Sequence, residues 1–148
     1  MAELPEPYLK CGVLCERVLD EKDGVLSFVR VVDRHIVTAE GTKVPVEMPP
    51  GRANLTAVMM WCGGLGNHEA KIQIIMPGDK KWESPTFPFF LDSFERGYNI
   101  VARLDLEIKQ AGLYWVEFLL NGKVRSRMPW RVIYRRIEHP PAPSSGET

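Results

Sequence analysis

The residues with the clearest chemical potential lie together in one short segment, residues 61–68, which reads Trp-Cys-Gly-Gly-Leu-Gly-Asn-His. Cys62 and His68 are the residue types that form nucleophile–base pairs or bind zinc. The glycines between them are the residue type that loops use when their backbone binds a phosphate group. Each of these uses needs a particular neighbour, so the elements on either side of the segment decide among them.

The stretch that follows the segment argues against a phosphate site. A phosphate-binding loop leads into a helix, whose first N–H groups point at the anion. Residues 69–76 instead alternate apolar and polar side chains, with Ile72, Ile74 and Met76 on one face, and this pattern predicts a strand. The segment is therefore interpreted as a connection between two strands, in which glycine relieves tight backbone angles.

Neither a metal site nor a catalytic site follows from the same residues. A zinc site would need two more ligands, and the candidates are Cys11 and Cys15. These two cysteines share a strand face with apolar Leu9 and are interpreted as small core residues. No signature of a known nucleophile flanks Cys62 or His68. We assign no catalytic residue, no metal and no cofactor.

A row of arginines is the main polar feature of the C-terminal part. Residues 123–136 hold six basic residues and no acidic residue. Because alternate residues of a strand lie roughly 6.6–6.8 Å apart on one face, the odd-numbered arginines form a basic line about 30 Å long. Such a line suits phosphates or an acidic partner. The candidate binding residues are Arg125, Arg127, Arg131 and Arg135, together with Trp115.

The favoured alternative for these arginines is pairing across the sheet. Their expected partners are the outward acids of the two preceding strands, Asp105, Glu107 and Glu117. Apolar residues share the outward positions, which predicts that something covers this face. They are Val101, Trp115, Leu119 and Ile133. The candidates for the cover are residues 39–52, the C-terminal tail and a second subunit.

Period-two alternation, broken by turn residues, predicts strands along most of the chain. Residues 39–52 are rich in proline and glycine and are expected to form a surface connection. About eight short strands at regular spacing predict an all-β fold, a single antiparallel β-sandwich. The expected strands cover residues 9–19, 25–33 with an extension to 37, 53–62, 69–76, 82–91, 98–108, 113–120 and 123–135.

Local signals sharpen several of these strands. The pair Asn121-Gly122 is typical of a two-residue hairpin turn. The prolines within residues 82–91 lack the N–H group that a sheet ladder needs, so this strand is expected at a sheet edge. Tyr114, which follows a glycine by two residues, resembles the tyrosine corner of Greek-key sandwiches.

The bulk composition limits the classes of partner and compartment. Among 148 residues, nineteen are basic and nineteen acidic, so no global field draws the chain to nucleic acid or to an anionic membrane. No apolar run approaches the roughly 18 residues that span a bilayer. The first residues lack the pattern of a signal peptide, and three cysteines then favour reduced thiols in a cytoplasm. We expect an N-terminal extension over residues 1–8, a sandwich domain over 9–137 and a disordered tail over 138–148.

Several strand and turn segments together resemble a family of small bacterial proteins of unknown function. These segments are VLCERVL at residues 13–19, KDGVLS at 22–27, VVDR at 31–34, GLYWV at 112–116, NG at 121–122 and MPWRV at 128–132. The resemblance covers residues 9–135 and implies a C2-like or immunoglobulin-like sandwich. It implies no catalytic residues.

Together these observations predict a non-catalytic binding or scaffold module that acts through the outward face of its C-terminal strands. A protein partner, or self-association into a homo-oligomer, is expected, and nucleic acid is the less favoured partner. The alternative is a ligand-binding or small enzymatic domain that uses the 62–68 loop with His35.

Overall fold

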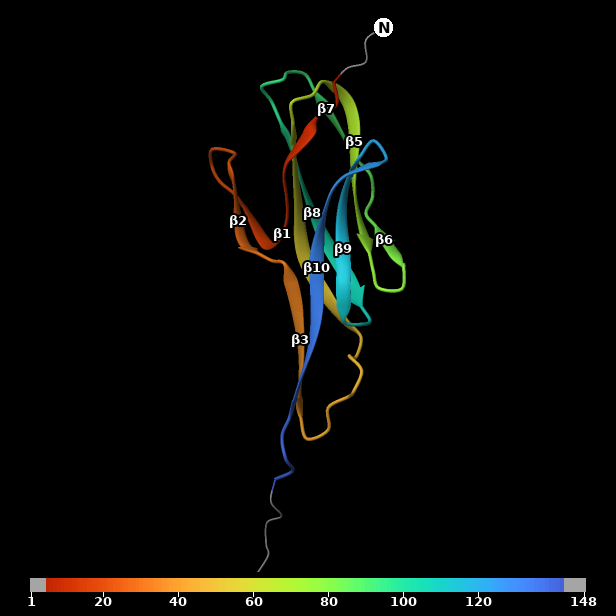
Figure 1. Cartoon of the computed structure of the whole chain (residues 1–148). Helices are drawn as coiled ribbons and strands as arrows, with labels where there is room; N and C mark the ends of the chain where they lie inside the picture. The colour runs from red at the N-terminus through yellow and green to blue at the C-terminus, as the bar shows by residue number, and fades with distance from the viewer. Residues whose placement is uncertain (1–4, 143–148) are drawn as a thin grey trace, which may run out of the picture.

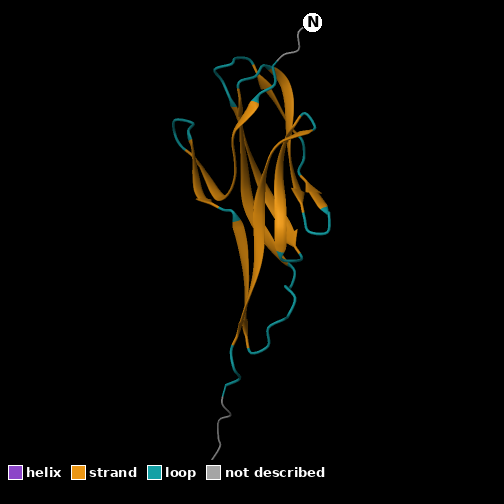
Figure 2. Cartoon of the chain, viewed as in Figure 1, coloured by secondary structure: helices purple, strands orange, loops and turns teal. Residues whose placement is uncertain are grey.

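The computed structural model describes residues 5–142, which form ten strands and no helix (Figure 2). These strands form two sheets, which confirms the predicted all-β sandwich. None of this part of the chain forms a helix long and apolar enough to cross a membrane. The predicted extension and tail fall in part on residues 1–4 and 143–148, which lie outside the described residues. The strands are β1 (Tyr8–Asp20), β2 (Leu26–Val31), β3 (Arg34–Gly41), β4 (Gly51–Cys62), β5 (Gly66–Ile75), β6 (Lys81–Glu83), β7 (Phe87–Leu91), β8 (Tyr98–Ile108), β9 (Gly112–Leu120) and β10 (Lys123–Glu138).

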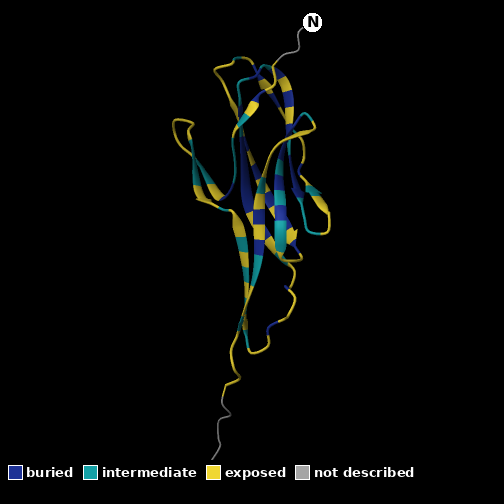
Figure 3. Cartoon of the chain, in the orientation of Figure 1, coloured by how far each residue is buried: buried dark blue, intermediate teal, exposed yellow. Residues whose placement is uncertain are grey.

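The two sheets enclose one core (Figures 1 and 3). Sheet A has the strand order β2-β1-β4-β8, and sheet B has the order β3-β10-β9-β5-β6, with β7 also paired to β5. Trp61 on β4 and Trp130 on β10 are fully buried in the core. The inward residues predicted for β8 and β9 are all buried, as the alternation indicated. They are Ile100, Ala102, Leu104, Leu106, Ile108, Tyr114, Val116, Phe118 and Leu120.

The return strand predicted after the first hairpin is two strands that belong to different sheets. The Val32 N–H group still donates to the Leu14 carbonyl of sheet A at 2.9 Å. The next carbonyl, that of Asp33, accepts from the Arg131 N–H group of sheet B at 3.3 Å. After this change of sheet, β3 pairs in parallel with β10. The other described strand pairs are antiparallel.

Strand β1 presents a different face to the core from the one that simple alternation predicted. Its register against β4 shifts between Leu9 and Cys11, and such a bulge reverses the faces beyond it. Leu9 and Leu14 therefore both pack on the core. Cys15 is fully buried, as predicted, but Cys11 is only half-buried, so its interpretation as a core residue is wrong.

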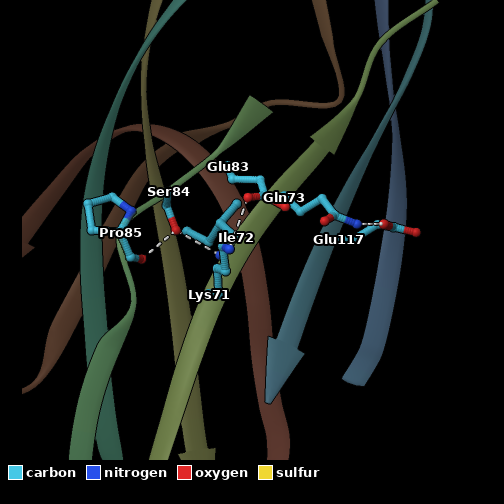
Figure 4. Close-up of polar contacts among 7 residues, drawn as sticks. All are labelled: Lys71, Ile72, Gln73, Glu83, Ser84, Pro85 and Glu117. Carbon is cyan, nitrogen blue, oxygen red and sulfur yellow. Dashed lines mark hydrogen bonds and ion pairs between the residues drawn. The ribbon is translucent and has the colours of Figure 1, made fainter. Parts of the chain in front are cut away.

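The proline-containing stretch 82–91 lies at a sheet edge, as predicted, but it forms two short strands, β6 and β7. Between them the Ser84 hydroxyl accepts from the Ile72 N–H group at 2.9 Å and donates to the Pro85 carbonyl at 2.8 Å (Figure 4). Lys71 and Glu83 form an ion pair at 3.1 Å beside it. These contacts hold the edge of sheet B where proline cannot donate to the ladder.

Residues 42–50 close one end of the sandwich. Val44 and Met48 are buried, and Met48 belongs to the core cluster. The Tyr134 hydroxyl donates to the Pro45 carbonyl at 2.8 Å, and the Arg136 guanidinium donates to the Val44 carbonyl at 3.0 Å. The predicted surface connection therefore covers an end of the core.

Two local signals in the C-terminal part have the geometry that the sequence indicated. Asn121 and Gly122 have φ angles of 50° and 81°, and two positive φ angles in succession define the common two-residue hairpin turn. The Tyr114 hydroxyl donates to the Gln110 carbonyl at 2.7 Å, which is the contact of a tyrosine corner. Burial raises the pKa of Tyr114, so its hydroxyl stays protonated and can donate.

Candidate functional site

Three arginines of β10 lie on the outer face of sheet B, as the alternation predicted. Arg127, Arg131 and Arg135 are exposed, whereas Trp130 between them is fully buried. The parallel pairing of β3 with β10 places Arg34 opposite Arg131. We call the surface formed by Arg34, Arg127, Arg131 and Arg135 the basic face. Sequence reasoning missed Arg34 because no local signal shows which strand lies beside β10.

Arg125 stands apart from this face. The register of β10 against β9 shifts between Val124 and Ser126, so Arg125 lies in a bulge. Its guanidinium forms an ion pair with Glu6 of the N-terminal segment. A further hydrogen bond, from Asn121, is the largest cause that lowers the pKa of Glu6. The N-terminal segment therefore occupies Arg125, which the sequence had grouped with the other arginines.

The prediction that these arginines pair with Asp105, Glu107 and Glu117 is wrong. Asp105 and Glu107 lie on β8, which pairs with β4 in the other sheet. Asp105 accepts two hydrogen bonds from the Arg52 guanidinium, each at 2.9 Å. Glu117 does lie opposite Arg127, but its carboxylate accepts from the Gln73 amide at 2.6 Å (Figure 4).

The arginines of β10 on the basic face consequently have no carboxylate partner in the described part of the chain. Within residues 5–142, no ion pair involves Arg127, Arg131 or Arg135. Arg34 lies 3.7 Å from the exposed carboxylate of Asp33, and exposed pairs of this kind contribute little stability. The positive charge of the basic face is therefore available to an outside partner.

Apolar side chains on the outer face of sheet B are only partly shielded from solvent. The Arg127 guanidinium carbon lies 3.9 Å from the centroid of the Trp115 ring, a cation–π contact. Leu119 is buried, and Ile133 is half-buried. Val101, which the sequence placed on the same surface, belongs to sheet A and is 46% exposed.

Only residues 63–65 of the 62–68 segment form a connection, which the N-terminal segment holds in place, and residues 66–68 already belong to β5. β4 ends at Cys62 and β5 begins at Gly66, so a strand follows the loop, as predicted. The Leu65 N–H group donates to the Pro5 carbonyl at 3.1 Å. A Cβ atom added to Gly63, whose φ is 81°, would lie 2.5 Å from the Tyr8 ring. The glycines therefore allow both the turn and the close approach of residues 5–8.

Cys62 and His68 line two different depressions of the surface. Cys62 lines one of about 420 Å³ together with Tyr8 and Phe94. His68 lines one of about 520 Å³ together with Phe90 and other residues. The structure therefore does not bring the thiol and the imidazole together in one depression.

Both ring nitrogens of His68 take part in hydrogen bonds within the chain. Nε2 donates to the Leu65 carbonyl at 2.7 Å, and Nδ1 accepts from the Asn121 amide at 3.0 Å. The same Asn121 accepts from the Glu69 N–H group at 3.0 Å. These bonds explain His68 as a residue that ties the β9–β10 turn to the start of β5.

The thiols show no arrangement that binds metal. Cys11, Cys15 and Cys62 are all free. Burial raises the pKa of Cys15, which keeps its thiol protonated and unreactive. In the part of the chain that the structure describes, no three His, Cys, Asp or Glu side chains gather closely enough to hold a metal ion.

Comparisons with known proteins include a distant structural likeness. No protein-family model and no curated protein matches the sequence. Among solved structures, the chain is similar to a Pseudomonas fluorescens alkylpurine DNA glycosylase, AlkC, bound to DNA that contains an abasic site analog. The identity is 13% and the TM-score is 0.39, over 65% of this chain and 27% of that one. The chain thus spans about a quarter of that structure. The resemblance to a bacterial C2-like or immunoglobulin-like family stays a prediction.

Proposed function

We propose that the chain is a non-catalytic binding module and that its basic face holds an acidic segment of another protein. The observation that carries this proposal is the row Arg127, Arg131 and Arg135, which has no ion-pair partner within the described residues and lies next to Arg34. A guanidinium group binds a carboxylate through two parallel hydrogen bonds. Unpaired arginines in a row therefore suit a segment that carries repeated carboxylates.

Apolar residues among the arginines favour a protein segment over nucleic acid. Ile36 and Ile133 lie opposite each other, and Ile36 is 44% exposed. An extended segment that alternates acidic and apolar residues, with same-side residues about 6.6–6.8 Å apart, matches this surface. Single-stranded nucleic acid uses free aromatic rings for base stacking, and the Trp115 ring is occupied by Arg127. The balanced net charge also provides no long-range attraction for a polyanion.

A double charge reversal on β10 tests this proposal. Arg131→Glu with Arg135→Glu should weaken the binding of a synthetic peptide of alternating glutamate and leucine by at least about tenfold. The reason is that two charge-assisted contacts become repulsions. Fluorescence anisotropy of the labelled peptide measures the affinity, and wild-type binding should weaken as salt is added.

The matched control reverses two exposed charges on β1 of sheet A. Lys10→Glu with Arg17→Glu changes the net charge by the same amount and should leave peptide binding as in the wild type. Equal peptide affinity for the wild type and the basic-face variant would contradict the proposal. Tighter binding of single-stranded oligothymidine than of the peptide would contradict the choice of a protein partner.

The proposal places this module in a reducing, cytoplasmic compartment. Its support is that Cys11, Cys15 and Cys62 form no disulfide. Free thiols persist in the cytoplasm, whereas oxidising compartments favour disulfides.

A further inference from the structure

The free edge of sheet A is long and regular. β8 has 11 residues, and within the described chain it pairs with β4 alone. Its register against β4 is continuous from Tyr98 to Ile108, with no bulge. The strand contains neither proline nor glycine. Its second edge therefore presents backbone N–H and C=O groups that can form another ladder.

The other edge strands are shorter, and several carry features that block pairing. β6 has 3 residues, and β7 has 5 residues, one of which is Pro88. β2 has 6 residues and contains Arg30 at a positive φ of 56°. β3 has 8 residues. Proteins commonly block exposed edges with short strands, proline or irregular backbone, so the regular edge of β8 indicates that it pairs with another strand.

The outer residues of β8 are complementary to themselves when a second copy runs antiparallel beside them. With a two-fold axis at Leu104, Arg103 of each copy lies opposite Asp105 of the other, because residue numbers at opposite positions then have a constant sum. The same register places Val101 opposite Glu107. On the inner side the two Leu104 side chains face each other and extend the apolar layer.

Charge selects this register over its neighbours. The two-fold axis has to pass beside a residue and not between two residues. An axis between two residues would shift the second copy by one position and turn its core side chains toward solvent. An axis at Arg103 places two arginines opposite each other, and an axis at Asp105 places two aspartates opposite each other. An axis at Leu106 places Asp105 opposite Glu107. The axis at Asp105 also places Arg103 opposite Glu107, but only the axis at Leu104 among these produces two pairs of opposite charge and no pair of like charge.

We propose that two copies of the chain associate through their β8 edges into a two-fold dimer in which the two A sheets are continuous. Arg103 is exposed and forms no ion pair within residues 5–142. Asp105 holds Arg52 at 2.9 Å, and a carboxylate has room for further donors. Asp105 therefore keeps Arg52 and also takes Arg103 of the second copy. The basic face of sheet B stays free, so the dimer does not depend on the proposed function.

Two single charge reversals give a sharp test. Arg103→Asp alone places two aspartates opposite each other, and Asp105→Arg alone places two arginines opposite each other. Each variant should therefore dimerise at least about tenfold more weakly than the wild type, because like charges across an interface repel. An equimolar mixture of the two variants should form a heterodimer, because every opposed pair then has opposite charges. Sedimentation velocity at about 0.1 mM chain measures the mass, since association depends on concentration.

The control keeps the charge change but moves it away from the edge. Arg17→Asp lies on β1 of the same sheet, next to β2, and should keep the wild-type dimer. Circular dichroism of every variant verifies the fold, because all these side chains are exposed. A wild-type chain that sediments as a monomer would overturn the proposal. Single variants that dimerise as the wild type does, or a mixture that remains monomeric, would overturn it equally.

Discussion

At the scale of single residues, the neighbours of a side chain decide what chemistry it has. His68 uses both ring nitrogens inside the chain. His35 is different: it lies on the inner side of β3, with its ring 5.8 Å from that of Trp130. Burial lowers the pKa of His35 below its ordinary 6.5, because an apolar environment disfavours the charged imidazolium.

This lowered pKa predicts a pH-dependent stability. The unfolded chain binds a proton at His35 more readily than the folded chain. The free energy of unfolding therefore has its full value above pH 6.5 and decreases as the pH drops from 6.5 toward the lower pKa of the folded state. His35→Phe keeps a ring beside Trp130 and removes this titration. Urea unfolding at about pH 7.5 and about pH 5.5 should therefore show a smaller loss for the variant. Identical losses in the two proteins would refute the assignment.

At the scale of elements, the connection between β4 and β5 is defined by what packs on it. A Cβ atom added to Gly64 would meet the Pro7 nitrogen and would lie 2.8 Å from the Pro5 carbonyl oxygen. Both atoms belong to backbone or a proline ring, which cannot rotate away. The N-terminal segment also contributes Glu6, the partner of Arg125. This loop and residues 5–8 therefore form one packed unit at the end of the sandwich.

A methyl group at position 64 should separate the N-terminal segment from the β4–β5 loop. Gly64→Ala forces residues 5–7 away from the loop, and overpacking of this kind costs about 1–3 kcal/mol of unfolding free energy. Gly51→Ala is the matched control, because a Cβ atom at Gly51 meets nothing within 4 Å, and surface changes stay within about 0.5 kcal/mol. Denaturant unfolding of both variants measures the difference. Equal stability of the two would show that the segment does not pack on the loop.

At the scale of the whole molecule, the core is closed at its ends as well as along its faces. The N-terminal segment lies at one end of the sandwich, and residues 42–50 lie toward the other (Figure 1). Met48 reaches the core cluster and is 7% exposed, whereas Val46, two residues earlier, is 79% exposed. The sandwich therefore depends on a segment without regular secondary structure.

Truncation of Met48 and of Val46 to alanine should show that burial determines how much each side chain stabilises the fold. Met48→Ala leaves a cavity in the core and should lower the free energy of unfolding by about 2–4 kcal/mol. Val46→Ala removes a side chain that mostly faces water and should change it by less than about 0.5 kcal/mol. Chemical denaturation monitored by tryptophan fluorescence suits this comparison, because Trp61 and Trp130 are buried in the core. A small effect of Met48→Ala would mean that the end of the core is open.

Alternation along the sequence predicted much of the fold. It placed the inward residues of β8 and β9 correctly, because regular strands direct every second side chain to the same side. It failed at β1, where the bulge after Leu9 reversed the faces. It also missed the change of sheet after Val32, since the alternation continues through it. Local patterns do not record a bulge or a crossover, because both depend on the strand that lies alongside.

The sequence by itself determined that the protein is all-β, that Arg127, Arg131 and Arg135 share one exposed face, and that a strand follows the glycine segment. Only the tertiary structure decided which groups meet. It placed Arg34 beside Arg131 and paired Asp105 with Arg52. Within residues 5–142 it left Arg127, Arg131 and Arg135 without an ion pair to a carboxylate. The physical reason is that side-chain direction follows from local backbone geometry, whereas strand order results from burying one common core.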